Sequence, residues 1–263
     1  MRLKHKKALV TGASGGIGRA IALQLAREGC WVGVHYFDKE EEAKQVQTEI
    51  ENQGGKAYLF QADLSEVAQA KSIATAAWEA MQGIDYLVNN AGISYKKHFL
   101  DVDEADVDAF MDVNFKGTFF LSQTLAHLMI QHHVEGSIYT ITSVNALRPG
   151  LGLSTYGATK GALETLMKGV AMELAPHQIR VNTIALGAFE TDITAPVWQN
   201  PTLLKEVNDG IPMGRFGQPY EAAAVIVDLL SSGSYLTGAS ITLDGGLLLM
   251  RGYGKPGLYD TEK

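Results

Sequence analysis

The stretch KALVT (7–11), GASGGIG (12–18) and RAIALQLAR (19–27) decides the fold of this chain. Its first part is a short apolar run that predicts a buried strand, and its last part predicts a helix rich in Ala, Leu and Ile. Between them, the glycines from Gly12 to Gly18 let the backbone approach a pyrophosphate while the helix N-terminus faces the anion. A strand, a glycine-rich loop and a helix in this order predict a nucleotide site.

The rest of the chain repeats this alternation of apolar runs and amphipathic segments, which is typical of a parallel sheet flanked by helices. Further strands are predicted at residues 31–36, 57–61, 86–88, 137–142, 180–185 and 240–243. Further helices are predicted at residues 40–53, 72–81, 103–131 and 220–230, and around residues 156–160. We therefore predict an α/β fold, a single Rossmann-type doubly wound parallel sheet with helices on both faces. Residues 1–263 would form one dinucleotide-binding and catalytic domain.

Two segments interrupt the alternation. Residues 187–212 have no clear period and contain two prolines before Pro212. A connection of this length inside a compact domain is usually functional, so we predict a substrate loop at about 187–212. The tail from about 251 is rich in glycine and charge, and we expect it to be loosely ordered unless it docks on a neighbouring subunit.

The composition restricts the class of protein. A chain of 263 residues can bury a substantial core, and its formal charge of −7 without a Lys/Arg cluster argues against a nucleic-acid partner. The single cysteine, Cys30, excludes an internal disulfide framework and is expected to be a buried small side chain. No apolar stretch of about 18 residues occurs, so we expect no membrane span or signal peptide and a cytoplasmic location.

No metal site is expected. The acidic residues Asp101, Asp103, Asp106 and Asp108 superficially resemble a calcium loop, but the turn glycine and the terminal glutamate of such a loop are missing. Acidic residues at a helix N-terminus explain them better. Three histidines, His127, His132 and His133, have no supporting carboxylate pattern, and we expect them to face solvent.

Tyr156 and Lys160 form the clearest catalytic candidate. Four residues apart on a helix, they lie on one face, where an ammonium can sit beside a phenol. A nearby cation favours the phenolate and lowers the pKa of a tyrosine, which makes proton exchange with an alcohol or carbonyl oxygen plausible. Taken alone, such a pair is common on helix surfaces, so its interpretation depends on the other motifs.

The loop Thr11–Gly18 resembles the TGxxxGxG signature of the short-chain dehydrogenase/reductase family, and other motifs of that family follow in order. Asp63-Leu64, Asn89-Asn90-Ala91-Gly92 and Asn114 match its adenine contact, its NNAG motif and its helix asparagine. Ser143, thirteen positions before Tyr156, matches its serine, and Asp244-Gly245-Gly246 resembles its closing turn. The resemblance implies an NAD(P)-dependent oxidoreductase that interconverts a secondary alcohol and a carbonyl.

The resemblance also implies the site residues. The catalytic residues would be Asn114, Ser143, Tyr156 and Lys160. The cofactor-binding residues would be Gly12, Ser14, Gly16, Ile17, Gly18, Tyr36, Asp63, Leu64, Asn90, Ala91, Gly92, Tyr156, Lys160, Gly187 and Thr191. In this scheme Ser143 binds the substrate oxygen, Tyr156 exchanges the proton, and Asn114 anchors a water that links Lys160 to solvent. Because the carboxyl ends of parallel strands meet at one edge, the residues that follow the strands, Asp63 included, should converge on one crevice.

The choice of cofactor is read at the end of the second strand, where an acid would bind the adenosine 2′-hydroxyl and repel a 2′-phosphate. That position is Tyr36, and the first acid is Asp38. We therefore favour NADP(H), with NAD(H) possible. A family phosphate-binding residue is also missing at Gly15, and Lys39 is the basic candidate near the strand. Leu186 stands where the family usually has proline, which leaves the following loop less rigid.

The substrate is the least defined part. Residues 211–217 resemble bacterial glucose 1-dehydrogenases and 3-oxoacyl-carrier-protein reductases alike. The pocket candidates are Ser94, Tyr95, Lys96, Asn145, Arg148, Trp198 and Met250, a mixed set that suits a sugar, a polyol or a small ketone. An acidic carrier protein needs a basic docking face, which the sequence does not indicate, so the carrier-protein reductase is an alternative. A non-catalytic dinucleotide-sensing protein is a further alternative, and the family resemblance predicts a homotetramer.

Overall fold

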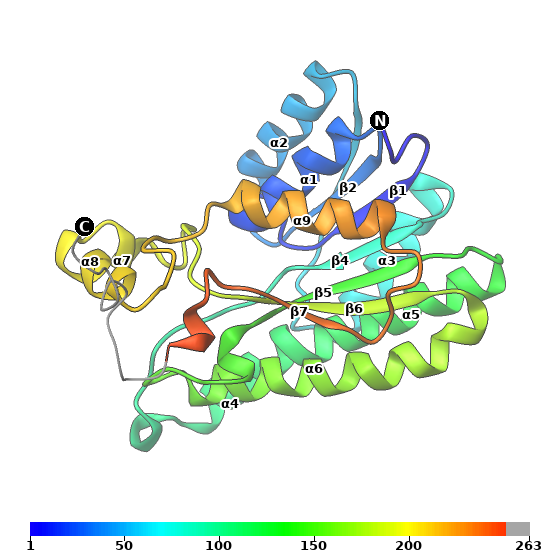
Figure 1. Ribbon diagram of the computed structural model, residues 1–263. Coiled ribbons are helices and arrows are strands. Elements are labelled where there is room, and N and C mark those ends of the chain that lie inside the picture. Colours follow the sequence, from blue (N-terminus) through cyan, green and yellow to red (C-terminus); the bar gives the residue numbers. More distant parts are fainter. Residues whose placement is uncertain (251–263) are drawn as a thin grey trace.

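The computed structural model describes residues 1–250 of the chain (Figure 1). Seven strands form one parallel sheet in the order β3-β2-β1-β4-β5-β6-β7. The strands are β1 (Lys7–Val10), β2 (Trp31–Tyr36), β3 (Lys56–Gln61), β4 (Tyr86–Asn89), β5 (Ser137–Ser143), β6 (Arg180–Leu186) and β7 (Ser240–Leu243). The predicted doubly wound parallel sheet is confirmed. The predicted tail from residue 251 lies outside the described residues.

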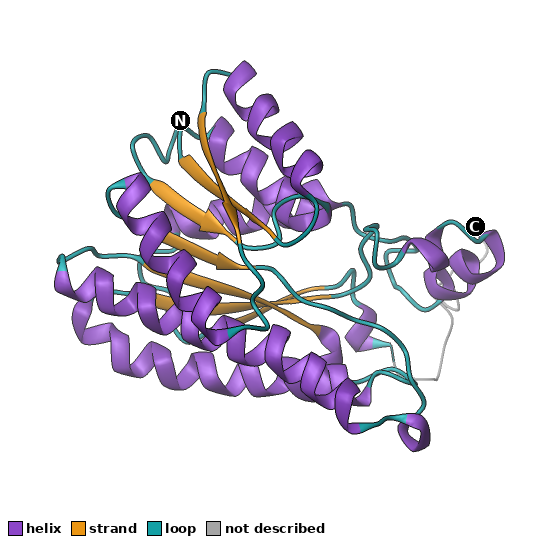
Figure 2. Cartoon of the chain, turned by 180° about the vertical axis from the view of Figure 1, so that it is seen from behind, coloured by secondary structure: helices purple, strands orange, loops and turns teal. Residues whose placement is uncertain are grey.

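Helices cover both faces of the sheet (Figures 1 and 2). One face carries α1 (Gly16–Arg27), α2 (Glu40–Asn52) and α9 (Pro219–Ser232), and the other carries α3 (Val67–Met81), α5 (Thr118–Gln131) and α6 (Ser154–Leu174). Three shorter helices are α4 (Glu104–Phe110), α7 (Ala195–Trp198) and α8 (Pro201–Asp209). None of the helices within residues 1–250 is long and apolar enough to cross a membrane.

The core consists of two apolar layers, one on each side of the sheet. Ile21 and Ile226 belong to the layer under α1 and α9, and Leu125 and Leu163 belong to the layer under α5 and α6. Each fully buried side chain of this size contributes about 1.5–3 kcal/mol. Cys30 lies in the first layer with 1% of its surface exposed, and burial raises the pKa of its thiol.

The elements differ from the predicted ones at three places. α3 begins at Val67 rather than at residue 72, because Ala68 and Ala70 favour a helix and Ala70 is fully buried. Ser143 is the last residue of β5 and not the first residue after it. Residues 187–212, which show no clear period in the sequence, contain the two helices α7 and α8.

The strand order places a crevice between β1 and β4. The chain moves from β1 outward to β3 and then returns to the other side of β1, so the connections after β1 and β4 diverge at their carboxyl ends. Such a switch point is where ligands bind in open α/β sheets. Gly12 and Asn90 follow these two strands, and they mark the place to look for a site.

Candidate active site

The glycine-rich segment after β1 has no room for a side chain at Gly18, which lies in the first turn of α1. A Cβ atom there would lie 2.2 Å from the carbonyl oxygen of Gly12, and Gly12 itself has a positive φ of 60°. α1 begins directly after the loop, and its N-cap residue Gly15 places no side chain over the first N–H groups. The backbone therefore offers hydrogen-bond donors to an anion at the positive end of a helix.

Asn90 and Thr11 hold this loop against β4. Asn90 Nδ2 donates to the carbonyl oxygens of Thr11 and Gly12, at 2.9 and 3.1 Å. The Thr11 hydroxyl accepts from the backbone N–H groups of Asn90 and Ala91, at 2.9 and 3.0 Å. The loop conformation thus depends on two side chains that directly follow the neighbouring strands β1 and β4.

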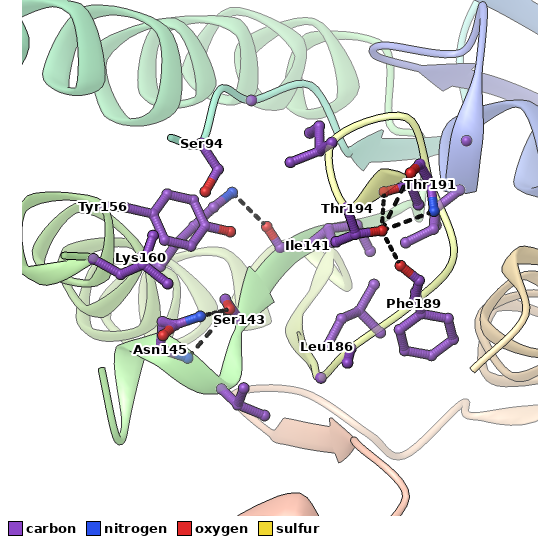
Figure 3. Close-up of a pocket in the computed structure, with 18 of the residues that line it drawn as sticks. Ser94, Ile141, Ser143, Asn145, Tyr156, Lys160, Leu186, Phe189, Thr191 and Thr194 are labelled. Atoms are coloured by element: carbon purple, nitrogen blue, oxygen red, sulfur yellow. Dashed lines mark hydrogen bonds between the residues drawn. The ribbon is translucent and has the colours of Figure 1, made fainter. Parts of the chain in front are cut away.

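Ser143, Tyr156 and Lys160 meet at the carboxyl end of β5 (Figure 3). Tyr156 lies in the first turn of α6, and Lys160 lies one turn further on the same face. The Lys160 side chain is buried. Its ammonium donates to the carbonyl oxygen of Ile141 at 3.0 Å and lies 5.9 Å from the centre of the Tyr156 ring. The three side chains surround a space in which a small oxygen-containing group fits.

The electrostatics of this cluster differ from the expectation that Lys160 lowers the pKa of Tyr156. Burial raises the pKa of Tyr156 above its usual value, and a hydrogen bond with Ser143 opposes that rise. Burial also lowers the pKa of Lys160 to about 8. Burial thus favours the neutral phenol of Tyr156, the form that donates a proton.

Asn114 lies behind the cluster, in a π-helical turn (Met111–Gly117) between α4 and α5. Its Oδ1 accepts from the Ile93 N–H at 2.8 Å, and its Nδ2 donates to the Ile93 carbonyl oxygen at 3.1 Å and to the Thr159 hydroxyl oxygen at 3.3 Å. Thr159 directly precedes Lys160. Asn114 therefore ties α6 to the segment that follows β4, and short π-helical turns of this kind are frequent at functional sites.

A cavity of about 1130 Å³ opens over these elements, large enough for a dinucleotide beside a small substrate. Most of the predicted site residues line it, namely Gly12, Ser14, Gly16, Ile17, Asn90, Ala91, Gly92, Ser143, Tyr156, Lys160, Gly187 and Thr191. The predicted residues that do not line it are Gly18, Tyr36, Asp63, Leu64 and Asn114. Gly18 and Asn114 instead contact residues that line the cavity.

Tyr36, Asp63 and Leu64 lie away from the cavity for a reason of topology. Tyr36 ends β2 with its side chain packed in one core layer, and Leu64 is buried in the other. The Asp63 carboxylate accepts from the backbone N–H and the hydroxyl of Ser65, at 2.9 and 2.7 Å. β3 is the edge strand, two positions from β1, so Asp63 does not converge with the glycine loop on the cavity as expected.

The segment after β6 folds back toward the glycine loop. Asp192 pairs with Lys39 at 3.1 Å, and both residues line the mouth of the cavity. Trp198 Nε1 donates to the Thr191 carbonyl oxygen at 2.9 Å, so its ring supports the segment rather than lining the cavity as predicted. Among the other pocket candidates, Ser94, Tyr95, Lys96, Asn145 and Arg148 line the cavity.

Met250, also predicted as a pocket residue, does not line the cavity. Its carbonyl oxygen accepts from Arg148 at 2.7 Å, and that of Leu247 accepts from the same guanidinium at 2.8 Å. The sequence analysis missed an apolar wall of the cavity that is formed by Leu153, Val197, Leu203, Val207, Leu247 and Leu248. Leu203 and Val207 stand four residues apart, and this helical spacing was the available signal.

His35 is a buried residue that the sequence analysis did not single out. Its Nδ1 accepts from the Gly12 N–H at 3.0 Å, and its Nε2 lies 3.1 Å from the Ala62 carbonyl oxygen. These two contacts require a neutral ring with the proton on Nε2. Burial lowers the pKa of His35 to about 4, in agreement with that form. His35 thus joins the glycine loop to the end of β3.

We expect this histidine to make the stability depend on pH. Its pKa is about 4 in the folded chain against an ordinary value of 6.5, so neutral His35 stabilises the fold above pH 6.5 and this contribution is lost as the pH falls toward 4. The expected decrease in the free energy of unfolding is about 3 kcal/mol over that range. Urea unfolding at several pH values measures it. His35→Asn should make the free energy of unfolding depend less on pH, because asparagine does not titrate and its amide oxygen can still accept from the Gly12 N–H. The control His177→Asn, on the exposed surface, should leave the pH dependence unchanged. A decrease that persists in His35→Asn would contradict the assignment.

The comparisons with known proteins agree with this geometry. Residues 12–248 match the family model described as enoyl-(acyl carrier protein) reductase. A short-chain dehydrogenase from Burkholderia cenocepacia J2315, solved in complex with NADP, is 33% identical, with 94% of this chain and 100% of that chain covered and a TM-score of 0.88. An acetoin dehydrogenase from Enterobacter cloacae is 35% identical, with 96% and 99% covered and a TM-score of 0.88. A short-chain dehydrogenase/reductase from Serratia marcescens BCRC 10948 is 32% identical, with 94% and 99% covered and a TM-score of 0.88.

A doubly wound sheet with a glycine-rich loop at its switch point defines a dinucleotide-binding oxidoreductase fold. The chain belongs to the short-chain dehydrogenase/reductase family, and it is an NAD(P)-dependent oxidoreductase that acts on CH–OH groups.

Proposed function

We propose that this enzyme reduces a small, largely apolar ketone to a secondary alcohol with NADP(H), and that Tyr156 is its general acid and base. The observation that carries the proposal is the placement of Ser143, Tyr156 and Lys160 around one space at the carboxyl end of β5, beside Gly92 and Gly187 in the same cavity. A panel of ketones, sugars, polyols and acyl thioesters, assayed with both cofactors, tests it. Turnover of sugars alone would contradict the substrate class.

Each of the three residues has one task in this reaction. Ser143 donates a hydrogen bond to the substrate oxygen, and Tyr156 gives that oxygen a proton. Lys160, whose pKa burial brings to about 8, holds a charge next to the phenol and replaces the proton that Tyr156 has given away. The nicotinamide supplies the hydride when it is bound, while the protein supplies placement and electrostatics. Burial raises the pKa of Tyr156, which favours the protonated phenol that the reduction step requires.

The residues fit a dinucleotide. The N–H groups of the glycine loop and of the first turn of α1 suit a pyrophosphate, and a Cβ at Gly92 would lie 3.0 Å from Asn114 Oδ1 and 3.4 Å from Lys160 Nζ, so a side chain there would crowd both. Asn114 would hold α6 in place behind this part of the site, and Thr191 and Gly187 would border the nicotinamide half.

Lys39 is the residue that favours NADP(H). It lines the cavity, and its only ion-pair partner among the described residues is Asp192, in a pair in which both side chains are about half exposed or more. A cation here can bind a 2′-phosphate, and β2 ends in Tyr36 rather than in an acid that would repel one. The NADP bound to the Burkholderia cenocepacia relative points the same way.

Lys39→Ala is expected to raise the Kd for NADPH about tenfold or more and to leave the Kd for NADH nearly unchanged, because a charge-assisted hydrogen bond to phosphate is lost. Fluorescence titration of both cofactors measures this. Lys44→Ala is the matched control, since Lys44 is also on the α2 side but pairs with Glu40 and Glu41 on its own helix. A wild-type enzyme that binds NADH far more tightly than NADPH would contradict the proposed preference for NADP(H).

The substrate class rests on the apolar wall from α7, α8 and the segment after β7. Sugar hydroxyl groups placed against Leu203, Val207 or Leu248 would lose their water without gaining partners, which costs binding energy. A ketone with short alkyl groups needs one polar contact, at Ser143. The Enterobacter cloacae protein, 35% identical, is named an acetoin dehydrogenase, and acetoin is a small ketone that also carries one hydroxyl group.

A 3-oxoacyl-carrier-protein reductase is the second candidate, but most cations at or near the cavity bind other groups, and among residues 1–250 Lys96 is the lining cation without an ion pair or hydrogen bond. Lys97 pairs with Asp103 and Asp106, Lys39 pairs with Asp192, and Arg148 donates to two backbone carbonyls. Little positive charge is left to attract an acidic carrier protein.

The non-catalytic alternative predicts cofactor binding without turnover. We also keep a homotetramer and a cytoplasmic location as proposals, on the family resemblance alone.

A further inference from the structure

Asn145 lies directly beside the catalytic serine, in a single helical turn that follows β5. Its backbone N–H and its side-chain Nδ2 both donate to the Ser143 hydroxyl oxygen, each at 3.1 Å (Figure 3). A hydroxyl oxygen has two acceptor sites and one proton to donate. Asn145 occupies both acceptor sites, so the Ser143 hydroxyl is left with its donor function alone.

The orientation of the Asn145 amide is determined by a third contact. The Gly150 N–H donates to Asn145 Oδ1 at 2.9 Å, which places the amide oxygen toward Gly150 and the amide nitrogen toward Ser143. A flipped amide would set two donors against each other at Gly150, and its oxygen would draw the Ser143 proton away from the cavity. The local hydrogen bonding therefore supports only one orientation.

The Asn145 backbone is also held against the helix that carries Tyr156. A Cβ atom on Gly157 would lie 2.6 Å from the Asn145 carbonyl oxygen, so α6 approaches this turn as closely as a glycine allows. Gly157 directly follows Tyr156. The position of Asn145 relative to the phenol is thus set by backbone packing.

From these contacts we infer that Asn145 is a positioning residue for the reaction: it directs the Ser143 proton toward Tyr156 and the reacting oxygen. The inference rests on the proposed function of that site. A carbonyl oxygen accepts hydrogen bonds and donates none, so a reductase needs a donor at Ser143, and a freely rotating hydroxyl would often present a lone pair instead. This orientation agrees with the direction in which Ser143 acts on the Tyr156 pKa, which it lowers against the effect of burial.

Asn145→Asp separates this role from a structural one. At pH 7.5 a carboxylate still accepts from the Gly150 N–H but cannot donate to Ser143, so the loop contact is kept and the donor is lost. With NADPH and 2,3-butanedione as the probe, we expect kcat to fall about tenfold to a hundredfold, with the Kd for NADPH unchanged. Asn145→Ala, which loses both contacts, should show a similar loss of kcat. Near-normal kcat in Asn145→Asp with a loss only in Asn145→Ala would mean that the loop contact matters, and would overturn the inference.

A double-variant cycle gives the second test. If Asn145 acts through Ser143, then Asn145→Asp should not lower kcat further in a Ser143→Ala background. If Asn145→Asp instead has a general effect on the fold, the fold-losses of kcat in the two single variants should multiply in the double variant. Thermal unfolding of each variant checks that it folds. Multiplied losses would overturn the inference.

A third readout needs no turnover, so it separates a failure of the inference from a failure of the proposed function. In protein labelled with ¹³C at tyrosine Cζ, the Tyr156 resonance is assigned by its absence in Tyr156→Phe. Asn145→Asp and Ser143→Ala should both displace it, because each variant takes away the proton that Ser143 would present to the Tyr156 oxygen. A Tyr156 resonance that does not move in Asn145→Asp overturns the positioning role. A displaced resonance in an enzyme that reduces none of the ketones overturns the proposed reaction only.

Discussion

Tyr156→Phe is expected to lower kcat by about 10²–10⁴-fold, because in the proposed reaction the phenol gives the substrate oxygen its proton. The Kd for NADPH should change by less than about threefold, since the ring and its packing remain. Stopped-flow measurement of NADPH oxidation with the fastest ketone of the panel, together with a fluorescence titration, measures both quantities.

Tyr95→Phe is the matched control in the same cavity. The Tyr95 hydroxyl donates to Asp106 at 2.9 Å and so is engaged away from the reaction centre. Its removal should leave kcat within a few-fold of the wild-type value. Retained activity in Tyr156→Phe would remove the catalytic assignment, and equal losses in both variants would point to damage of the cavity as a whole.

Gly18→Ala has the second-largest expected effect. The added methyl group would stand 2.2 Å from the Gly12 carbonyl oxygen and 2.5 Å from Asn90 Nδ2, and backbone cannot move aside as a flexible side chain can. We expect the free energy of unfolding to fall by about 1–3 kcal/mol, as for other overpacked sites. Displacement of the loop should weaken NADPH binding about a hundredfold or more, because its N–H groups no longer converge on one anion.

Gly169→Ala is the control for the added methyl group. Gly169 lies on the exposed side of α6 with no atom within 4 Å of its Cβ position, so alanine should stabilise the helix by up to about 1 kcal/mol. Urea unfolding, with the oligomeric state checked by light scattering, measures both variants. A Gly18→Ala enzyme that binds NADPH normally would show that the loop does not hold the pyrophosphate.

The βα units were predictable because each one is a continuous apolar run followed by a helical period. β5 is buried along its whole length and could be recognised for that reason. α7 and α8 were not predictable in the same way: they span 4 and 9 residues, begin close to prolines, and bury none of their residues. Short helices of this kind depend on caps such as Asn200 and on tertiary contacts, which local periodicity does not report.

The residues of the candidate site could be predicted from the sequence where side chains make the contacts, and less well where backbone groups make them. Tyr156 and Lys160 could be recognised by their spacing, but the acceptor of Lys160 is the carbonyl of Ile141, which any residue could supply. Tyr36 lies in a strand that is almost wholly buried, so no alternation of polar and apolar residues indicates which way its ring points. Trp198 is predicted as a pocket residue because it lies in the irregular segment 187–212, whereas its indole N–H donates to the Thr191 carbonyl oxygen.

The buried thiol of Cys30 has a practical consequence. It is the only cysteine of the chain, 1% exposed between α1 and β2, and burial keeps it in the unreactive protonated form. A thiol reagent can therefore modify the protein only when this part of the core opens. The rate of that modification therefore measures how often the core around α1 and β2 opens. A cofactor that binds the folded chain should slow the modification, so the degree of slowing by NADPH and by NADH would rank their affinities without any substrate.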